Sequence, residues 1–377
     1  MPDTNFTHPM RKWEDILTIV SGKNQKNVET DNGQYPIYGS GGIIGRANAF
    51  LCEAGTTIVG RKGTINSPIY VNERFWNVDT AFGIVPGPEL LPKFLYYFCR
   101  HFNFKDLDKS TTIPSLAKRD LLAIKMVVPS LPEQERIVAR IEELFSELDK
   151  AVETLNTTKQ QLAVYRQAVL KEALTPQPGW QKTIFSDLLT SVRNGYGKKP
   201  DDKGEYRILR ISSVRPDRVD LSDFRCNQQP FSSQDLISEN DLLFTRYNGS
   251  LEYVGVCGCV PVLQEEYAYP DKIIKCTPKI NNQYHSRFLQ YYLNQGDARK
   301  YILSKVKTTS GQKGIAGSDI KRVIVYVPEL FVQEAIVKKL DAQLTVCDQI
   351  EKTIEQSLQQ ADALRQSILK QAFEGRL

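Results

Sequence analysis

The sequence predicts an α+β protein in which two strand-rich, mixed α/β globules alternate with two long helices, giving approximate two-fold symmetry within one chain. Residues 129–174 and 328–373 repeat one another without a gap at an offset of 199. Both repeats carry apolar residues at the spacing of a paired helix, whereas short β-branched segments bounded by Gly, Pro and Asn precede each of them. Because internal repeats fix architecture, the order is globule, helix, globule, helix.

The expected division of the chain follows directly from this repeat. We expect a first globule at 1–128, a central helix at 129–175, a second globule at 176–327 and a C-terminal helix at 328–377. The 377 residues suffice for two domains with separate cores. Pro132 lies at the start of the first helix, and the segment Thr-Pro-Gln-Pro-Gly at 175–179 ends it. A helix from 133 to 173 would be about 60 Å long at ~1.5 Å per residue.

The apolar residues of both helices recur at alternating intervals of four and three. This period of about 3.5 over several heptads predicts a coiled-coil seam. Either the two helices pair with each other, antiparallel, or they pair with another chain; a globule between them makes the first arrangement simpler. Thr158 and Ser357, at equivalent places, either pin the register of the seam or reflect ordinary drift. The main predicted seam residues are Ile137, Ile141, Leu144, Leu148, Leu155, Leu162, Ile336, Leu340, Ile350, Ile354, Leu364 and Ile368.

Charge separates the globules from the helices. Residues 1–128 carry 15 basic and 12 acidic side chains, and residues 175–327 carry 22 and 16. Residues 129–174 and 328–377 each carry 6 basic and 8 acidic side chains. Basic globules favour contact with a polyanion, and acidic helices favour contact with protein.

The remaining bulk properties indicate a soluble cytoplasmic protein without a membrane partner. The N-terminus is polar, and no apolar run approaches the ~20 residues of a membrane span. The seven cysteines stand at irregular positions, as is usual for a reduced chain rather than a disulfide framework.

Both globules contain the same three anchors. Each opens with a tryptophan-led segment, at Trp13 and Trp180, and each closes with a polar loop before a β-branched strand. Between these anchors a strand enters a basic turn, at 55–64 and at 241–250. The candidate ligand-binding residues on these turns and on the second polar loop are Arg61, Lys62, Thr64, Arg246, Tyr247, Asn248, Lys307, Thr309, Gln312 and Lys313.

These residue types suit DNA. Arg pairs bidentately with guanine and Asn or Gln with adenine, whereas Lys, Thr and backbone amides bind phosphate. Any one of them alone is more often a solvated surface charge, so the argument rests on their recurrence in both globules. The segment Tyr35–Gly42 is either a tight aromatic turn or a contact loop, and we favour the turn.

No catalytic or metal-binding pattern accompanies these residues. Residues 55–63 approach a phosphate loop but lack its Lys-Ser/Thr pair, and the three histidines are scattered. Cys257 and Cys259 have no second pair at metal spacing, so a buried core position is favoured over zinc. Asp201 and Asp202 fit a turn better than a nuclease site. The pattern favours a reader without a catalytic centre, although an unrecognised enzyme site stays an alternative.

The chain resembles the DNA-specificity subunit of type I restriction–modification systems over essentially its whole length. The features that carry the resemblance are the two strand-rich halves, the opening Leu-Pro-Glu-Gln-Glu-Arg-Ile at 131–137 and its copy at 330–336. The ending Leu-Lys-Gln-Ala-Phe-Glu-Gly-Arg-Leu at 369–377 is similar as well. The copy has Phe331 and Val332 in place of Pro132 and Glu133, so its helix start is less well defined.

The resemblance implies two target-recognition domains that read the halves of a bipartite double-stranded DNA target, with the helices as a spacer of fixed length. It implies docking of two methyltransferase subunits, which use S-adenosylmethionine to methylate adenine, and of up to two ATP- and Mg-dependent restriction subunits. No cofactor is expected on this chain itself, which would be non-catalytic. The alternative is a standalone two-headed DNA-binding adaptor or repressor.

Overall fold

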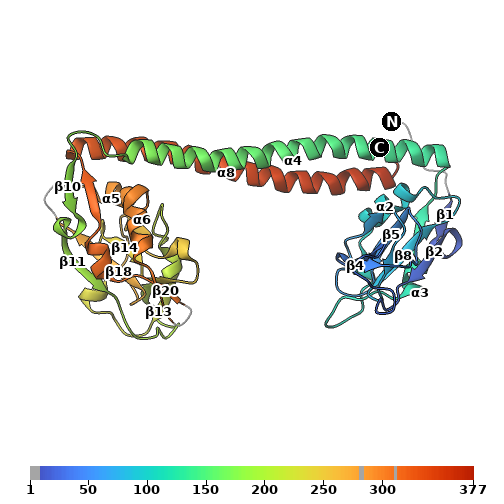
Figure 1. The fold of residues 1–377 in the computed structure, drawn as a ribbon, viewed down its shortest axis with the longest axis horizontal. Coiled ribbons are helices and arrows are strands. Elements are labelled where there is room, and N and C mark those ends of the chain that lie inside the picture. The colour runs from blue at the N-terminus through green and yellow to red at the C-terminus, as the bar shows by residue number, and fades with distance from the viewer. Residues whose placement is uncertain (1–8, 280–283, 310–311) are drawn as a thin grey trace. The chain divides into compact units, whose positions relative to one another are not determined.

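The computed structural model describes residues 9–279, 284–309 and 312–377. The chain forms two compact units, one of residues 1–157 with 353–377 and the other of residues 158–352. Each unit contains one globule and one half of each long helix (Figure 1). The boundary therefore falls inside the helices, because each half-helix packs on the globule of its own unit.

The first globule is built on a four-stranded antiparallel sheet in the order β2-β8-β5-β6. A smaller sheet, β4-β3-β7, lies beside it, and its β3–β7 pair is parallel. Strands β1 and β9, from the two ends of the globule's sequence, pair antiparallel. In chain order the elements are β1 (Met10–Lys12), α1 (Trp13–Ile16), β2 (Leu17–Ser21), β3 (Tyr35–Gly39), β4 (Gly42–Ala47), β5 (Thr56–Gly60), β6 (Ile69–Val71), β7 (Trp76–Asn77), β8 (Ala81–Pro86), α2 (Pro92–His101), η1 (Phe104–Leu107), α3 (Lys118–Leu122) and β9 (Lys125–Val127).

The core of the first unit joins the globule to the helices. Trp13, Phe94 and Phe104 are almost fully buried, and they belong to one apolar cluster with Ile141 and Leu369 of the long helices. The tryptophan-led opening is thus a core anchor. In the segment Tyr35–Gly42, residues Tyr35–Gly39 form strand β3, and a tight turn at 40–41 leads into β4.

The second globule repeats the topology of the first, which its sequence outside the anchors did not indicate. Its main sheet has the order β11-β18-β14-β16, and its smaller sheet, β13-β12-β17, again contains one parallel pair. The pair β10–β21 corresponds to β1–β9. The elements are β10 (Gln181–Ile184), η2 (Phe185–Leu188), β11 (Leu189–Asn194), β12 (Tyr206–Leu209), η3 (Ile211–Ser213), β13 (Phe224–Asn227), η4 (Ser233–Asp235), β14 (Leu242–Thr245), β15 (Tyr247–Asn248), η5 (Leu251–Tyr253), β16 (Cys257–Cys259), β17 (Tyr267–Ala268), β18 (Ile273–Pro278), α5 (Ser286–Leu293), α6 (Gly296–Ser304), β19 (Lys307–Thr309), β20 (Gln312–Gly314), α7 (Gly317–Lys321) and β21 (Ile324–Val327).

The two long helices are α4 (Leu131–Leu174) and α8 (Leu330–Phe373), each of 44 residues. The first begins inside the predicted region 129–175 and two residues before residue 133, the start used to predict its length. The second begins at the equivalent place, 199 residues later, despite Phe331. In both units the half-helices run antiparallel. In the first unit Arg365 pairs with Asp149, and in the second Arg166 lies 2.7 Å from Asp348. The predicted pairing of the helices with each other is confirmed.

Ten of the twelve predicted seam residues are buried or half-buried, and two are exposed. Ile350 and Leu364 are 40% and 48% exposed, so their assignment to a buried seam was wrong. In the first unit, which contains Leu364, the globule covers one flank of the helix pair, where Phe145 and Leu369 are buried. Heptad positions on the uncovered flank stay open to solvent. Those that are buried are Ile137, Ile141, Leu162, Leu340, Ile354 and Ile368, and those that are half-buried are Leu144, Leu148, Leu155 and Ile336.

Candidate nucleic-acid interface

Arg61 and Arg246 occupy the same place in the two globules. Each follows the last residue of a central strand, β5 or β14. The backbone N–H of Arg61 donates to the carbonyl oxygen of Thr80 at 2.8 Å, and that of Arg246 donates to Lys272 at 2.8 Å. The two turns, which were matched by sequence, therefore occupy equivalent places in the structure.

Each arginine side chain is also held by one backbone carbonyl. Nη1 of Arg61 donates to the oxygen of Asp79 at 3.4 Å, and Nη1 of Arg246 donates to the oxygen of Asp271 at 3.3 Å. Within the described part of the chain, neither guanidinium forms an ion pair. A guanidinium has five N–H donors in a fixed fork, so both side chains are oriented while most of their donors stay available to a ligand.

In the first globule the basic turn and the predicted polar loop meet. Lys62 and Ser115 form an isolated antiparallel bridge, and the N–H of Gly63 donates to Pro114 at 2.9 Å. The turn is tight at Gly60, where a Cβ would lie 2.0 Å from the carbonyl oxygen of Thr64. Glycine is required there, and the side chains of Lys62 and Thr64 are exposed.

In the second globule six candidates lie in one small sheet of the order β15-β20-β19. The prediction of a polar loop over residues 307–314 was wrong for its described parts, because residues 307–309 pair with 312–314, and β20 also pairs with β15, the strand after Arg246. A Cβ on Gly314 would lie 2.5 Å from the ring of Tyr247, so the close pairing depends on glycine. The candidates in this sheet are Tyr247, Asn248, Lys307, Thr309, Gln312 and Lys313; the side chain of Thr309 is outside the described atoms.

A stacked pair marks one end of this sheet. The guanidinium carbon of Arg246 lies 4.8 Å from the ring centroid of Tyr247. Such stacking restricts the arginine without neutralising it. Asn248 accepts a hydrogen bond from the N–H of Ser250 at 3.0 Å through Oδ1.

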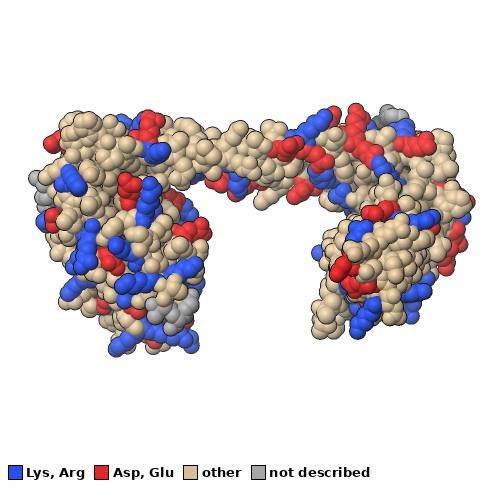
Figure 2. Space-filling model, viewed as in Figure 1, with Lys and Arg blue, Asp and Glu red and all other residues tan. Residues whose placement is uncertain are grey.

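A basic groove beside Arg246 was not recognised from the sequence. It has a volume of about 970 Å³ and includes Asp271, whose carbonyl holds the Arg246 side chain. Lysine and arginine side chains gather at the end of the second globule that carries β13 and β20 (Figure 2). The basic residues that line the groove are Lys198, Lys199, Arg210, Arg225 and Lys272.

Two of these five groove cations are already paired, with Arg210 beside Asp223 at 3.7 Å and Arg225 bound to Asp202. Among the described residues the three lysines form no ion pair. Asp202 has a positive φ of 61°, a backbone conformation typical of turns, as the turn interpretation predicted. Its carboxylate forms the ion pair with Arg225. The signal for this groove in the sequence was the pair of adjacent lysines in the glycine-containing segment 195–204. That segments far apart in the chain line one groove is visible only in the folded structure.

The cysteine pair of β16 belongs to the core. Cys257 and Cys259 are buried, and burial raises the pKa of both thiols, that of Cys259 to about 12. In the described ranges, no group of three or more His, Cys, Asp or Glu side chains converges in a way that suits a metal ion. Nor does any helix in those ranges combine the length and apolar composition needed to cross a membrane.

Comparison with known proteins agrees with this arrangement. The family model described as "Type I restriction modification DNA specificity domain" matches residues 9–162 and again 179–360. The specificity subunit of the type I restriction enzyme EcoKI from Escherichia coli K12 is 37% identical over 326 residues, which are 79% of this chain and 69% of that protein. The StySPI specificity subunit of Salmonella potsdam is 26% identical, with the same coverage.

Solved structures show the same fold. A chain from a study of complex assembly and conformational transition of the type I restriction–modification system matches with a TM-score of 0.77 at 16% identity, covering all of both chains. The HsdS subunit of Thermoanaerobacter tengcongensis matches with a TM-score of 0.58, also at 16% identity and over all of both chains. The repeated domain and the fold define a DNA-specificity protein. The chain belongs to the type I restriction–modification DNA specificity family.

Proposed function

We propose that this chain reads a bipartite DNA target, one half with each globule, and directs adenine methylation and restriction by partner subunits. The observation that carries the proposal is the duplication of the Arg61 turn at Arg246, in two globules with the same topology and different neighbouring side chains. A repeated framework with divergent contacts suits two readers of different sequences.

In this proposal the second globule makes the larger electrostatic contribution to DNA binding. Its groove contributes three lysines beside Arg246, whereas the first globule presents Lys62 and Thr64 on a tight turn. Lysines without acidic partners are suited to backbone phosphates, and the arginines and amides to base edges. The groove therefore positions the second globule on DNA while the sheet β15-β20-β19 reads it.

The partners follow from the family. Two methyltransferase subunits with S-adenosylmethionine would supply methylation, and up to two ATP-dependent restriction subunits would supply cleavage. The half-exposed and exposed apolar residues of the long helices, such as Ile350 and Leu364, offer contact surface for them. The length of the helices would then set the gap between the half-sites.

The experiment is methylation mapping in cells that express this chain with its methyltransferase partner. We expect N6-methyladenine in one bipartite motif with a constant gap. A second strain carries a chain whose residues 1–128 are replaced by those of a relative. One half of the motif should change, and the other half and the gap should stay. A continuous motif, or simultaneous change of both halves, would contradict the proposal.

A further inference from the structure

Each globule is fastened to its long helix by a fully buried glutamine. In the first unit, Nε2 of Gln134 donates to the carbonyl oxygens of Glu89 at 2.8 Å and Pro129 at 2.9 Å. Its Oε1 accepts from the N–H of Leu91 at 2.9 Å. Leu91 is the residue immediately before α2, so one side chain of α4 holds the start of a globule helix.

The second unit repeats this attachment. Gln333 of α8 donates to the carbonyl oxygen of Pro328 at 2.8 Å, and its Oε1 accepts from the N–H of His285 at 2.9 Å. His285 immediately precedes α5, as Leu91 precedes α2. Both glutamines are 0% exposed.

A carboxylate forms a second attachment farther along each helix. Glu142 accepts from Nζ of Lys93 at 2.6 Å and from the hydroxyl of Tyr97 at 3.4 Å. Burial raises the pKa of Tyr97 to about 12, so its hydroxyl stays protonated as a donor.

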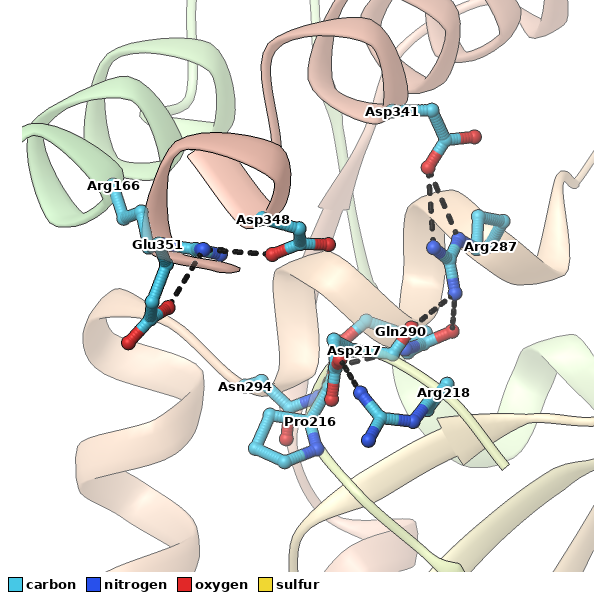
Figure 3. Close-up of polar contacts among 10 residues, drawn as sticks. All are labelled: Arg166, Pro216, Asp217, Arg218, Arg287, Gln290, Asn294, Asp341, Asp348 and Glu351. Atoms are coloured by element: carbon cyan, nitrogen blue, oxygen red, sulfur yellow. Dashed lines mark hydrogen bonds and ion pairs between the residues drawn. The ribbon is translucent and has the colours of Figure 1, made fainter. Parts of the chain in front are cut away.

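The equivalent carboxylate in the second unit is Asp341. It accepts from Nε and Nη2 of Arg287 at 3.3 and 3.2 Å (Figure 3). It also accepts from the hydroxyl of Tyr291. In the same view Nη1 of Arg287 donates hydrogen bonds to the carbonyl oxygen of Asp217 and to Oε1 of Gln290. Asp217 lies in the segment that connects β12 to β13, and residues of both strands line the basic groove.

The two sets have identical spacing. The glutamine and the carboxylate are eight residues apart on the long helix, at 134 and 142 and at 333 and 341. On the globule the amide, the cation and the tyrosine stand at 91, 93 and 97 and at 285, 287 and 291. The lengths of the paired side chains compensate as well. Glutamate, the longer acid, pairs with lysine at Glu142 and Lys93, and aspartate, the shorter acid, pairs with arginine at Asp341 and Arg287.

We propose that these residues are positioning residues, which fix the orientation of each globule on its helix; this inference rests on the proposed function for its consequence at DNA. The glutamine acts as a pivot, and the carboxylate, about 12 Å along the helix at ~1.5 Å per residue, prevents rotation about it. Stability alone does not account for the second attachment. The Lys93 and Glu142 side chains are 50% and 39% exposed, and ion pairs this exposed stabilise folded chains little.

The chain offers a matched control for the test. Glu142→Gln removes the ion pair between Glu142 of α4 and Lys93 of α2. Glu143→Gln, at the next residue, breaks a comparably exposed pair with Arg140 that lies entirely within α4. The reciprocal variant Lys93→Glu with Glu142→Lys reverses both charges and restores the attraction.

The measurement is the distance distribution between spin labels on the full-length chain, placed through unnatural amino acids at the exposed positions Asn72 and Glu147 of the first unit. In Glu142→Gln, the population of displaced orientations should rise about two- to fivefold, as expected for loss of a partly exposed pair. Glu143→Gln should keep the wild-type distribution, and the charge-reversed double variant should return towards it. Equal distributions for Glu142→Gln and Glu143→Gln would overturn the inference.

A second measurement separates this inference from the proposed function. With partner subunits present, Glu142→Gln should methylate the same half-sites across a wider range of gap lengths than Glu143→Gln. A broadened distance distribution together with wild-type gap selectivity would retain the mechanical role and overturn its consequence at DNA. An unchanged distance distribution with a normal bipartite motif would overturn the positioning role and leave the DNA-reading function intact.

Discussion

Replacement of Gln134 by alanine should destabilise the first unit strongly. The substitution removes three hydrogen bonds and leaves the N–H of Leu91 and the carbonyl groups of Glu89 and Pro129 without that partner. Each buried polar group left unsatisfied costs about 1–3 kcal/mol. Because solvent can reach part of this set after the change, we expect a loss of about 3–5 kcal/mol in the free energy of unfolding. That is a large share of the ~5–15 kcal/mol typical of a domain.

Urea unfolding followed by tryptophan fluorescence measures this loss. Trp13 and Trp76 report on the first unit, and a Trp180→Phe background removes the signal of the second. With a slope of about 1–3 kcal/mol/M, the midpoint should fall by 1 M or more.

Asn156→Ala is the control, since this amide side chain is exposed on the same helix within the first unit and should cost no more than about 0.5 kcal/mol. A midpoint shift for Gln134→Ala as small as that of Asn156→Ala would refute the reasoning.

Three further outcomes are expected. Arg246→Ala should weaken DNA binding by about 1–3 kcal/mol and relax the sequence preference at one base. Titration of the protein with duplex DNA that carries the motif found by methylation mapping measures this loss; unchanged affinity with reduced thermal stability would make Arg246 structural. Insertion of one heptad into each long helix beside residues 157 and 352 adds about 10 Å to both, and methylation mapping should show a changed gap with the same half-sites; full activity at the original gap would exclude the helices as the ruler. Burial and the cation of Lys370 lower the pKa of His101 below its usual 6.5, so protonation favours the unfolded chain, and urea midpoints of the first unit should fall as pH decreases through about 6.5. His101→Phe, which keeps a ring against Phe373, should remove that dependence, and an equal pH dependence in this variant would contradict the assignment.

The helices and the paired turns were predictable because they depend on local pattern. Seam spacing requires only the sequence of one helix, and Arg61 and Arg246 were found because each follows a short strand segment and precedes a glycine. The exposure of Ile350 and Leu364 was not predictable, since a heptad pattern does not say which flank of the helix pair a globule covers. The pairing of β20 with β15 was missed because β15, at Tyr247, is distant in sequence.

The shared topology and the groove were hidden for a different reason. Equivalent strands of the two globules carry different side chains, so their common order appears only in hydrogen-bond pairing. The groove combines segments near 198, 210, 225 and 272, which no local pattern connects. Gln134 and Gln333 stood in the repeated motif, but their role depends on amides at Leu91 and His285, which a helix-based comparison does not include.

The distribution of the seven cysteines makes the native chain selectively reactive. Six of the thiols are buried, whereas Cys226 is half-exposed and lines the basic groove. Reactivity of a thiol depends on access and on its thiolate form, and burial raises the pKa of most of the other six. A maleimide dye should therefore attach at the groove without any engineered residue. Protection of Cys226 from the dye would then report, on the unmodified sequence, when the groove is occupied.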